Sequence, residues 1–373
     1  MKILRITFAV LSLIVVVGVV AIGSLIIFVD PNQLKPTLVK EVMKQTGYRL
    51  LIDGHLSWSF YPRLGVKVEH MTLGVPNQSI PFMDLSHVRM TIPLSSLLNR
   101  NDALRGSIYV AHVRLATLHL QQAKMKIEWK NNTLTLSPIT ATLYQGSVSG
   151  IVRGSQLSTF PRWDGDMQWN NIQLQPLFQD VNSKIKLSGI GKMALQINTV
   201  GKNKDQLIRN LNGMATFNVD QGILYGIDLN YLVQTADALL NKQSPHVPPK
   251  DNETPFNQMM GAAIIKNGVA TSENLLVTSS AFTTKGLGAI NFIDQTLTYQ
   301  LQVAPLQTAK IKWAIPMIIT GSLQNPSVRL DMLKLNTLIA QEQFEKIKTK
   351  IQKEVKLLPG KVDKLLQRFM DNQ

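Results

Sequence analysis

Histidine and carboxylate side chains are the residues of this sequence that could bind a metal ion or transfer protons. Two histidines that bind zinc from one helix stand four residues apart, and no pair here has that spacing. His112 and His119 lie seven residues apart, so on a single strand they would face opposite sides. We therefore expect no metal site from the six histidines, which are His55, His70, His87, His112, His119 and His246.

Two short motifs resemble parts of known ligand-binding loops. Asp164 and Asp166 flank Gly165 as in a calcium loop, but the other ligands of such a loop are missing. Gly189 and Gly191 precede Lys192, without the spacing of a phosphate-binding loop. A turn and a strand bulge explain the two motifs better. We expect no catalytic residues, no cofactor and no enzymatic activity.

The first thirty residues contain the longest apolar segment of the chain. Residues 6–29 carry no charged side chain, and about 20 apolar residues suffice for a helix to cross a bilayer. Lys2 and Arg5 precede this segment and Asp30 follows it, which predicts a cytoplasmic N-terminus and an exported remainder. The alternative is a signal peptide cleaved near Ala21–Gly23. The apolar residues that follow that site favour a retained anchor.

Composition narrows the classes of partner. Cysteine is absent, so disulfides and thiolate chemistry are excluded, and the formal net charge is +15. An exported basic protein is not expected to meet nucleic acid. Anionic lipid head groups or lipopolysaccharide phosphates are better candidates, although the charge could also serve solubility alone.

A short amphipathic helix is expected directly after the apolar segment. Asp30 and Pro31 have the pattern of a helix cap followed by proline in the first turn. Gly47 is a natural end of this helix. Its apolar positions, at spacings of three and four, make a membrane-proximal face of Leu34, Leu38, Val42 and Met43.

Strict alternation of apolar and polar residues begins after Tyr48 and predicts strands with one apolar face. Strand-like runs then recur about every 8–12 residues, which is typical of antiparallel sheets. Alternation alone favours an ordinary closed core, and it does not say which face is inside. The apolar positions are Leu56, Trp58, Phe60, Leu64, Val66 and Val68 near the helix, and Leu297, Tyr299, Leu301 and Val303 near the far end.

The chain divides into five regions by composition. We expect an N-terminal segment and anchor over residues 1–29, a β domain over 30–240, a proline-rich linker over 241–255, a second β region over 256–332 and an amphipathic helical tail over 333–373. Pro359 and Gly360 predict that the tail is two helices. The tail could dock on the body, on a partner protein, or on an anionic membrane surface.

Several segments resemble the AsmA family in their residues and in their order. Near the N-terminus they are Phe28–Leu38 and Gln45–Val68, and Ala141–Gly150 follows. In the C-terminal half they are Asp220–Leu229, Lys266–Ala270, Lys285–Ile290 and Ile315–Pro326. The chain is shorter than typical members of the family.

The resemblance implies an inner-membrane-anchored, single-pass periplasmic protein of a Gram-negative envelope. The implied fold is α+β and mostly antiparallel β: a transmembrane helix, an elongated curved β-sheet with short helices, and a helical tail. The apolar positions named above would then line a groove for phospholipid, in support of lipid transport and outer-membrane assembly. Further partners would be the inner membrane and other envelope proteins. The alternative is a scaffold for outer-membrane proteins that carries no lipid.

Overall fold

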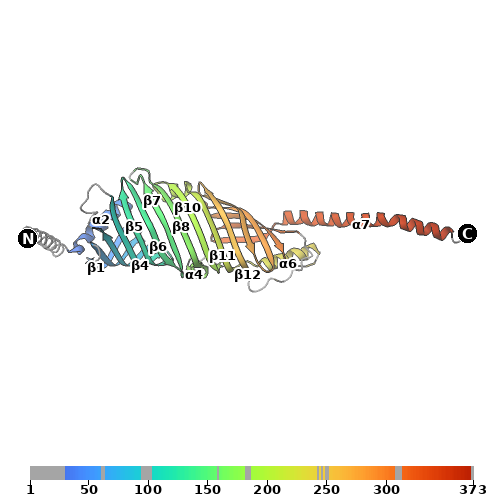
Figure 1. Ribbon diagram of the computed structural model, residues 1–373, viewed down its shortest axis with the longest axis horizontal. Helices are drawn as coiled ribbons and strands as arrows, with labels where there is room; N and C mark the ends of the chain where they lie inside the picture. The colour runs from blue at the N-terminus through green and yellow to red at the C-terminus, as the bar shows by residue number, and fades with distance from the viewer. Residues whose placement is uncertain are drawn as a thin grey trace, which may run out of the picture.

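The computed structural model describes residues 30–59, 64–93, 103–157, 159–180, 186–241, 243–244, 247, 252–306 and 313–370. Most of these residues belong to one sheet of 17 strands. Figure 1 shows the sheet as an elongated body whose strands lie oblique to its long axis, with β1 at one end and α6 near the other.

The strands follow one another in the sheet as they do in the chain. Each pairs antiparallel with the next, except that β8 pairs with β10 while the short β9 pairs with β11. The first eleven are β1 Arg49–Ser59, β2 Leu64–Gly74, β3 Met83–Ile92, β4 Leu104–Leu115, β5 Leu118–Lys130, β6 Thr133–Leu143, β7 Gly146–Ser155, β8 Arg162–Gln173, β9 Lys186–Leu187, β10 Ile190–Val200 and β11 Asn212–Tyr225. The remaining six are β12 Glu253–Lys266, β13 Val269–Thr278, β14 Phe282–Asn291, β15 Thr296–Pro305, β16 Ile315–Ser322 and β17 Asn325–Leu330.

The described helices are few, and all but the last are short. They are the 3-10 helix η1 Pro31–Leu34 and the α-helices α2 Lys35–Thr46, α4 Leu174–Asp180, α5 Lys204–Arg209, α6 Leu229–Leu240 and α7 Met332–Met370. Asp30 caps η1 and Asp228 caps α6, because each carboxylate accepts a hydrogen bond from a backbone N–H of the first turn.

The expected fold class, an α+β protein that begins with a transmembrane helix, is wrong. The described chain is dominated by one large open antiparallel sheet, and its helices are accessory. None of the described helices is long and apolar enough to cross a membrane. The segment expected to form such a helix, residues 6–29, lies outside the described residues.

The expectation of two helices in the tail is also wrong. The backbone of α7 runs unbroken from Met332 to Met370 and passes through Pro359 and Gly360. Proline removes one hydrogen bond from a helix interior and can bend it without ending it when the residues on both sides favour helix. The lysines, glutamates and leucines around Pro359 are such residues.

Irregular residues in the middle of several strands bend the sheet. The register shifts between Asp53 and Leu56 in β1 and between Gln121 and Lys124 in β5. Gly54 and Gln122, which lie at these shifts, have positive φ angles of 79° and 51°. Bulges of this kind kink a strand and increase its twist. The sheet curls further toward its end, since α6 contacts both β12 and β17, which lie five strands apart.

The edge strand β1 is protected by the residues that precede it. The side-chain amide of Asn32 donates to the carbonyl oxygen of Leu56 at 3.2 Å, and the backbone N–H of Leu56 donates to Asn32 Oδ1 at 2.9 Å. Lys35 Nζ donates to the carbonyl oxygen of Gly54. These side chains occupy backbone groups that could otherwise pair with a strand of another molecule.

We expect Asn32→Ala to destabilise the protein by about 2 kcal/mol, because it removes two hydrogen bonds to Leu56 worth about 1 kcal/mol each, besides an exposed bond from its side-chain amide to Asp30. The freed edge should also promote self-association, visible as a concentration-dependent scattering signal. Urea unfolding measures the first effect. Gln33→Ala changes an exposed neighbour and is the control; equal stability of the two variants would contradict the capping role of Asn32.

Candidate functional site

The apolar positions predicted near the N-terminus lie side by side on two paired strands. Leu56 on β1 is opposite Val68 on β2, and Trp58 is opposite Val66. Leu64 is opposite Ile92 on β3. Phe60 lies outside the described residues.

One row of apolar residues and glycines continues from this pair across the entire sheet, with one residue from every strand except β9. Most neighbours in the row are direct cross-strand partners. At two bulges the row continues through contacts: Ala123 and Ala141 share one cluster, and Gly261 faces Leu275. This apolar row consists of Leu56, Val68, Val88, Val110, Ala123, Ala141, Val148, Trp169, Met193, Phe217, Gly261, Leu275, Gly286, Leu301, Met317 and Leu330.

The row places the near-end and far-end candidates on the same face of the sheet. Leu301 belongs to the row itself, and Leu297, Tyr299 and Val303 share its parity on β15. Sequence alternation showed only which residues of one strand share a face. The pairing across all the strands joins these local faces into one.

Between β1 and β6 the apolar row is buried although no residue of a described helix belongs to its cluster. Val68, Val88 and Val110 are only 2%, 3% and 3% exposed. Half-buried apolar residues flank the row on both sides and shield it; these flanking residues are Ile52, Val66, Met71, Leu85, Met90, Ile108, Val113 and Leu120. Between β1 and β6 the half-exposed apolar side chains of the flank therefore form the surface on this face of the sheet.

The same face is closed at the far end. Leu301 is 5% exposed and Val303 is fully buried, together with Ile315 and Met317. Helices α4, α6 and the start of α7 supply apolar side chains to this cluster, including Leu174, Leu229, Ala236 and Leu335. Of the far-end candidates, Leu301 and Val303 therefore lie in an ordinary packed core, whereas Leu297 and Tyr299 are half-buried. Leu120 on β5 packs against both the near-end and the far-end clusters.

The residues predicted to make a membrane-proximal face lie on η1 and α2. Leu38 and Met43 are exposed, and Val42 is half-buried. Leu34 is the last residue of η1. Both η1 and α2 contact β1, at the edge of the sheet.

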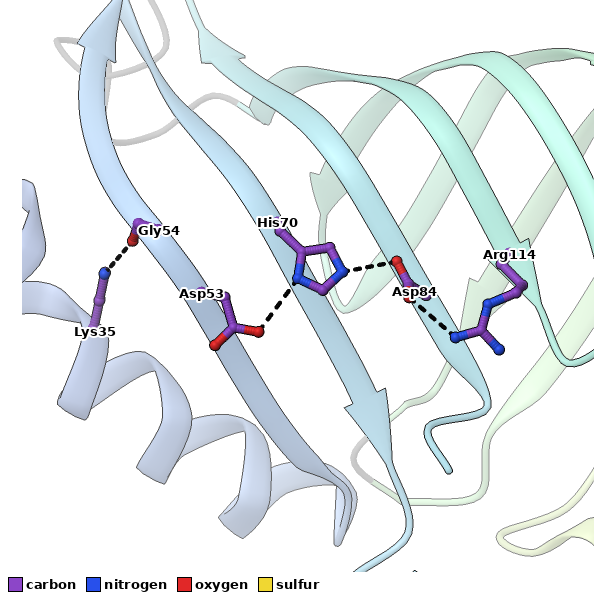
Figure 2. Close-up of polar contacts among 6 residues, drawn as sticks. All are labelled: Lys35, Asp53, Gly54, His70, Asp84 and Arg114. Atoms are coloured by element: carbon purple, nitrogen blue, oxygen red, sulfur yellow. Dashed lines mark hydrogen bonds and ion pairs between the residues drawn. The ribbon is translucent and has the colours of Figure 1, made fainter. Parts of the chain in front are cut away.

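The opposite face of the sheet carries a ladder of charged side chains across β1–β4. His70 Nδ1 lies 3.3 Å from Asp53 Oδ2, and His70 Nε2 lies 2.9 Å from Asp84 Oδ1. Arg114 donates to Asp84 Oδ2 at 3.0 Å. Figure 2 shows these side chains in a line on neighbouring strands, with Lys35 and Gly54 beside them.

This charged ladder is not arranged for catalysis. Both ring nitrogens of His70 face carboxylates, so neither is free to activate the hydroxyl of Ser86, which is opposite His70 on β3. No group of three or more metal-ligating side chains occurs among the residues that the structure describes. Cross-strand charge pairs of this kind stabilise the sheet. Sequence spacing could not reveal the ladder, because its members lie far apart in the chain.

Partial burial alone would raise the pKa of Asp84, but hydrogen bonds from Arg114 and His70 outweigh it and hold the pKa below the ordinary 3.8. Such a carboxylate stabilises the fold above its unfolded-state pKa, and this contribution is lost as the pH falls through the folded-state pKa. We expect Asp84→Asn to be less stable than wild type at pH 7, and the difference to shrink below about pH 4. Urea unfolding at both pH values measures it; a difference independent of pH would contradict the ionic role of Asp84.

Comparison with known proteins identifies relatives of the chain. The sequence profile described as "AsmA family" matches residues 1–105 and 100–275. Protein AsmA of Escherichia coli (strain K12) is 30% identical over 95 residues, which are 26% of this chain and 15% of that protein. The chain thus matches only a small part of the length of this curated relative. No solved structure matches the chain.

Proposed function

Because the chain belongs to the AsmA family, which is linked to envelope biogenesis, we propose that it binds phospholipid acyl chains along the apolar face of its sheet. In this role the protein works in the periplasm without enzymatic chemistry and supports lipid transport and outer-membrane biogenesis. Its partners are phospholipid, the inner membrane and proteins of outer-membrane assembly. The exposed Leu38 and Met43 of α2 would contact the membrane near the open end of the face.

The observation that carries this proposal is the half-exposed flank of the apolar row between β1 and β6. Ile108 and Met90 are opposite each other on one side of the row, and Leu85 and Val113 on the other. A ligand lying along the row between them would contact apolar side chains only. Each buried CH₂ gains about 0.8 kcal/mol, so an acyl chain with ten half-buried CH₂ groups gains about 4 kcal/mol.

Site-specific crosslinking tests the proposal in the full chain. A photoreactive phenylalanine analogue at Ile108, beside the apolar row, should crosslink to phospholipid in cells labelled with radioactive phosphate. The same analogue at Tyr109, which points to the opposite face, is the matched control. Crosslinking to lipid at Ile108 alone supports the proposal.

The rival function is a scaffold for outer-membrane proteins that carries no lipid. It predicts protein adducts and no phospholipid at Ile108, and no phospholipid in mass spectra of the purified chain. Equal labelling at Ile108 and Tyr109 would also count against a specific face.

A further inference from the structure

Among the side chains that the structure describes, those of the first three turns attach helix α7 to the sheet. Leu335 is fully buried against the far-end cluster. Lys334 Nζ donates to Gln300 Oε1 at 2.8 Å, and Trp313 Nε1 donates to Glu342 Oε2 at 2.8 Å. Helix α7 extends away from the sheet along the long axis of the molecule (Figure 1).

The free part of α7 presents large apolar side chains to solvent. Phe344, Ile347 and Ile351 are 65%, 58% and 55% exposed. Their spacing of three and four residues places them on one face of the helix, over about 10 Å of its length. In the sequence the same spacing continues at Val355 and Leu358. Exposed large apolar side chains gathered on one helix face make this face a candidate binding surface.

Positive charges border the stripe on both sides. By helix geometry, Lys348 and Lys350 lie about 80° to either side of the line through Ile347 and Ile351. Both lysines are exposed. Lys348 forms a surface ion pair with Glu345 at 3.5 Å, and such pairs contribute little to stability. The surface is therefore apolar in the middle and cationic at its borders.

The lysines that border the apolar stripe indicate which kind of partner binds it. A second copy of α7 would bring a stripe with the same lysine borders against this one, and the sheet of the same chain does not cover the stripe. We infer that α7 is an interfacial helix that lies on an anionic lipid surface, with Phe344, Ile347 and Ile351 in the acyl boundary and Lys348 and Lys350 at the head groups. This contact is separate from lipid binding on the sheet.

The absence of cysteine in the chain allows a direct test. An environment-sensitive fluorophore is attached to full-length Ile351→Cys, and to Thr349→Cys on the opposite side of the helix as the matched control. With vesicles of equal parts phosphatidylglycerol and phosphatidylcholine, the label at 351 should shift to the blue, brighten several-fold and be quenched by nitroxide-labelled acyl chains. The label at 349 should not be quenched.

Charge removal tests the second half of the inference. Each basic residue near an anionic surface contributes about 1 kcal/mol to the free energy of binding. The double variant Lys348→Gln and Lys350→Gln should therefore bind vesicles about 30-fold more weakly, as measured with the label at position 351. Lys192→Gln with Lys202→Gln removes the same charge from β10 and the loop that follows it, and should leave vesicle binding unchanged.

Three outcomes would overturn the inference. The first is an equal response to vesicles of phosphatidylcholine alone, and the second is no response to either vesicle. The third is a blue shift without vesicles that grows with protein concentration, which would assign the stripe to a second copy of the chain. Each is distinct from a failure of crosslinking at Ile108, which concerns the sheet.

Discussion

We expect Leu120→Glu to yield a folded protein that purifies with little or no phospholipid. Leu120 is half-buried and packs against both apolar clusters. It therefore lies where the acyl chain of a phospholipid would pass from the open part of the apolar face to the closed part. Burying an unpaired carboxylate against hydrocarbon costs several kcal/mol. The half-exposed position lets the carboxylate reach water when lipid is absent, so the fold survives while lipid is excluded.

Gln121→Glu is a matched control for this variant. Gln121 is the next residue on β5, is exposed on the opposite face, and receives the same charge with almost no change in shape. Phospholipid bound per protein is measured by mass spectrometry, and the fold by melting temperature. Wild-type lipid content in Leu120→Glu would refute acyl-chain binding on this face, and if that variant fails to fold, the uncharged Leu120→Gln provides the comparison.

We expect Val303→Asp, in contrast, to prevent stable folding. Val303 is fully buried between β14 and β16 and lies in the core that α6 and α7 complete. An aspartate there loses packing and buries a charge without a partner, which together cost about 4 kcal/mol or more. Circular dichroism and urea unfolding of the purified variant measure the loss.

The adjacent Gln302→Asp is the control for this core substitution. Gln302 is exposed on the opposite face and lies across from Lys285, so a new carboxylate there is solvated and close to a positive charge. A cooperatively folded Val303→Asp that has lost lipid would show that the far end is an open binding surface. Such a result would contradict the closed core.

The local structure of the strands and the family could both be predicted from the amino-acid sequence. Period-two alternation at Leu56, Trp58, Val66 and Val68 fixed which side chains share a face, because successive residues of a strand must point to opposite sides. The motifs from Phe28 to Pro326 indicated the AsmA family, and the family profile confirms it. Both kinds of signal lie within short stretches of the chain.

How these faces combine could be seen only in the folded protein. Whether Leu56 and Leu301 belong to one face depends on every register between β1 and β15, including the bulges, and a shift of one residue would reverse the side. The closure over Val303 depends on α6 and α7, which approach through the curl of the sheet. Strand pairing also forms the charged ladder, because it brings together residues that lie far apart in the chain. These residues are Asp53, His70, Asp84 and Arg114.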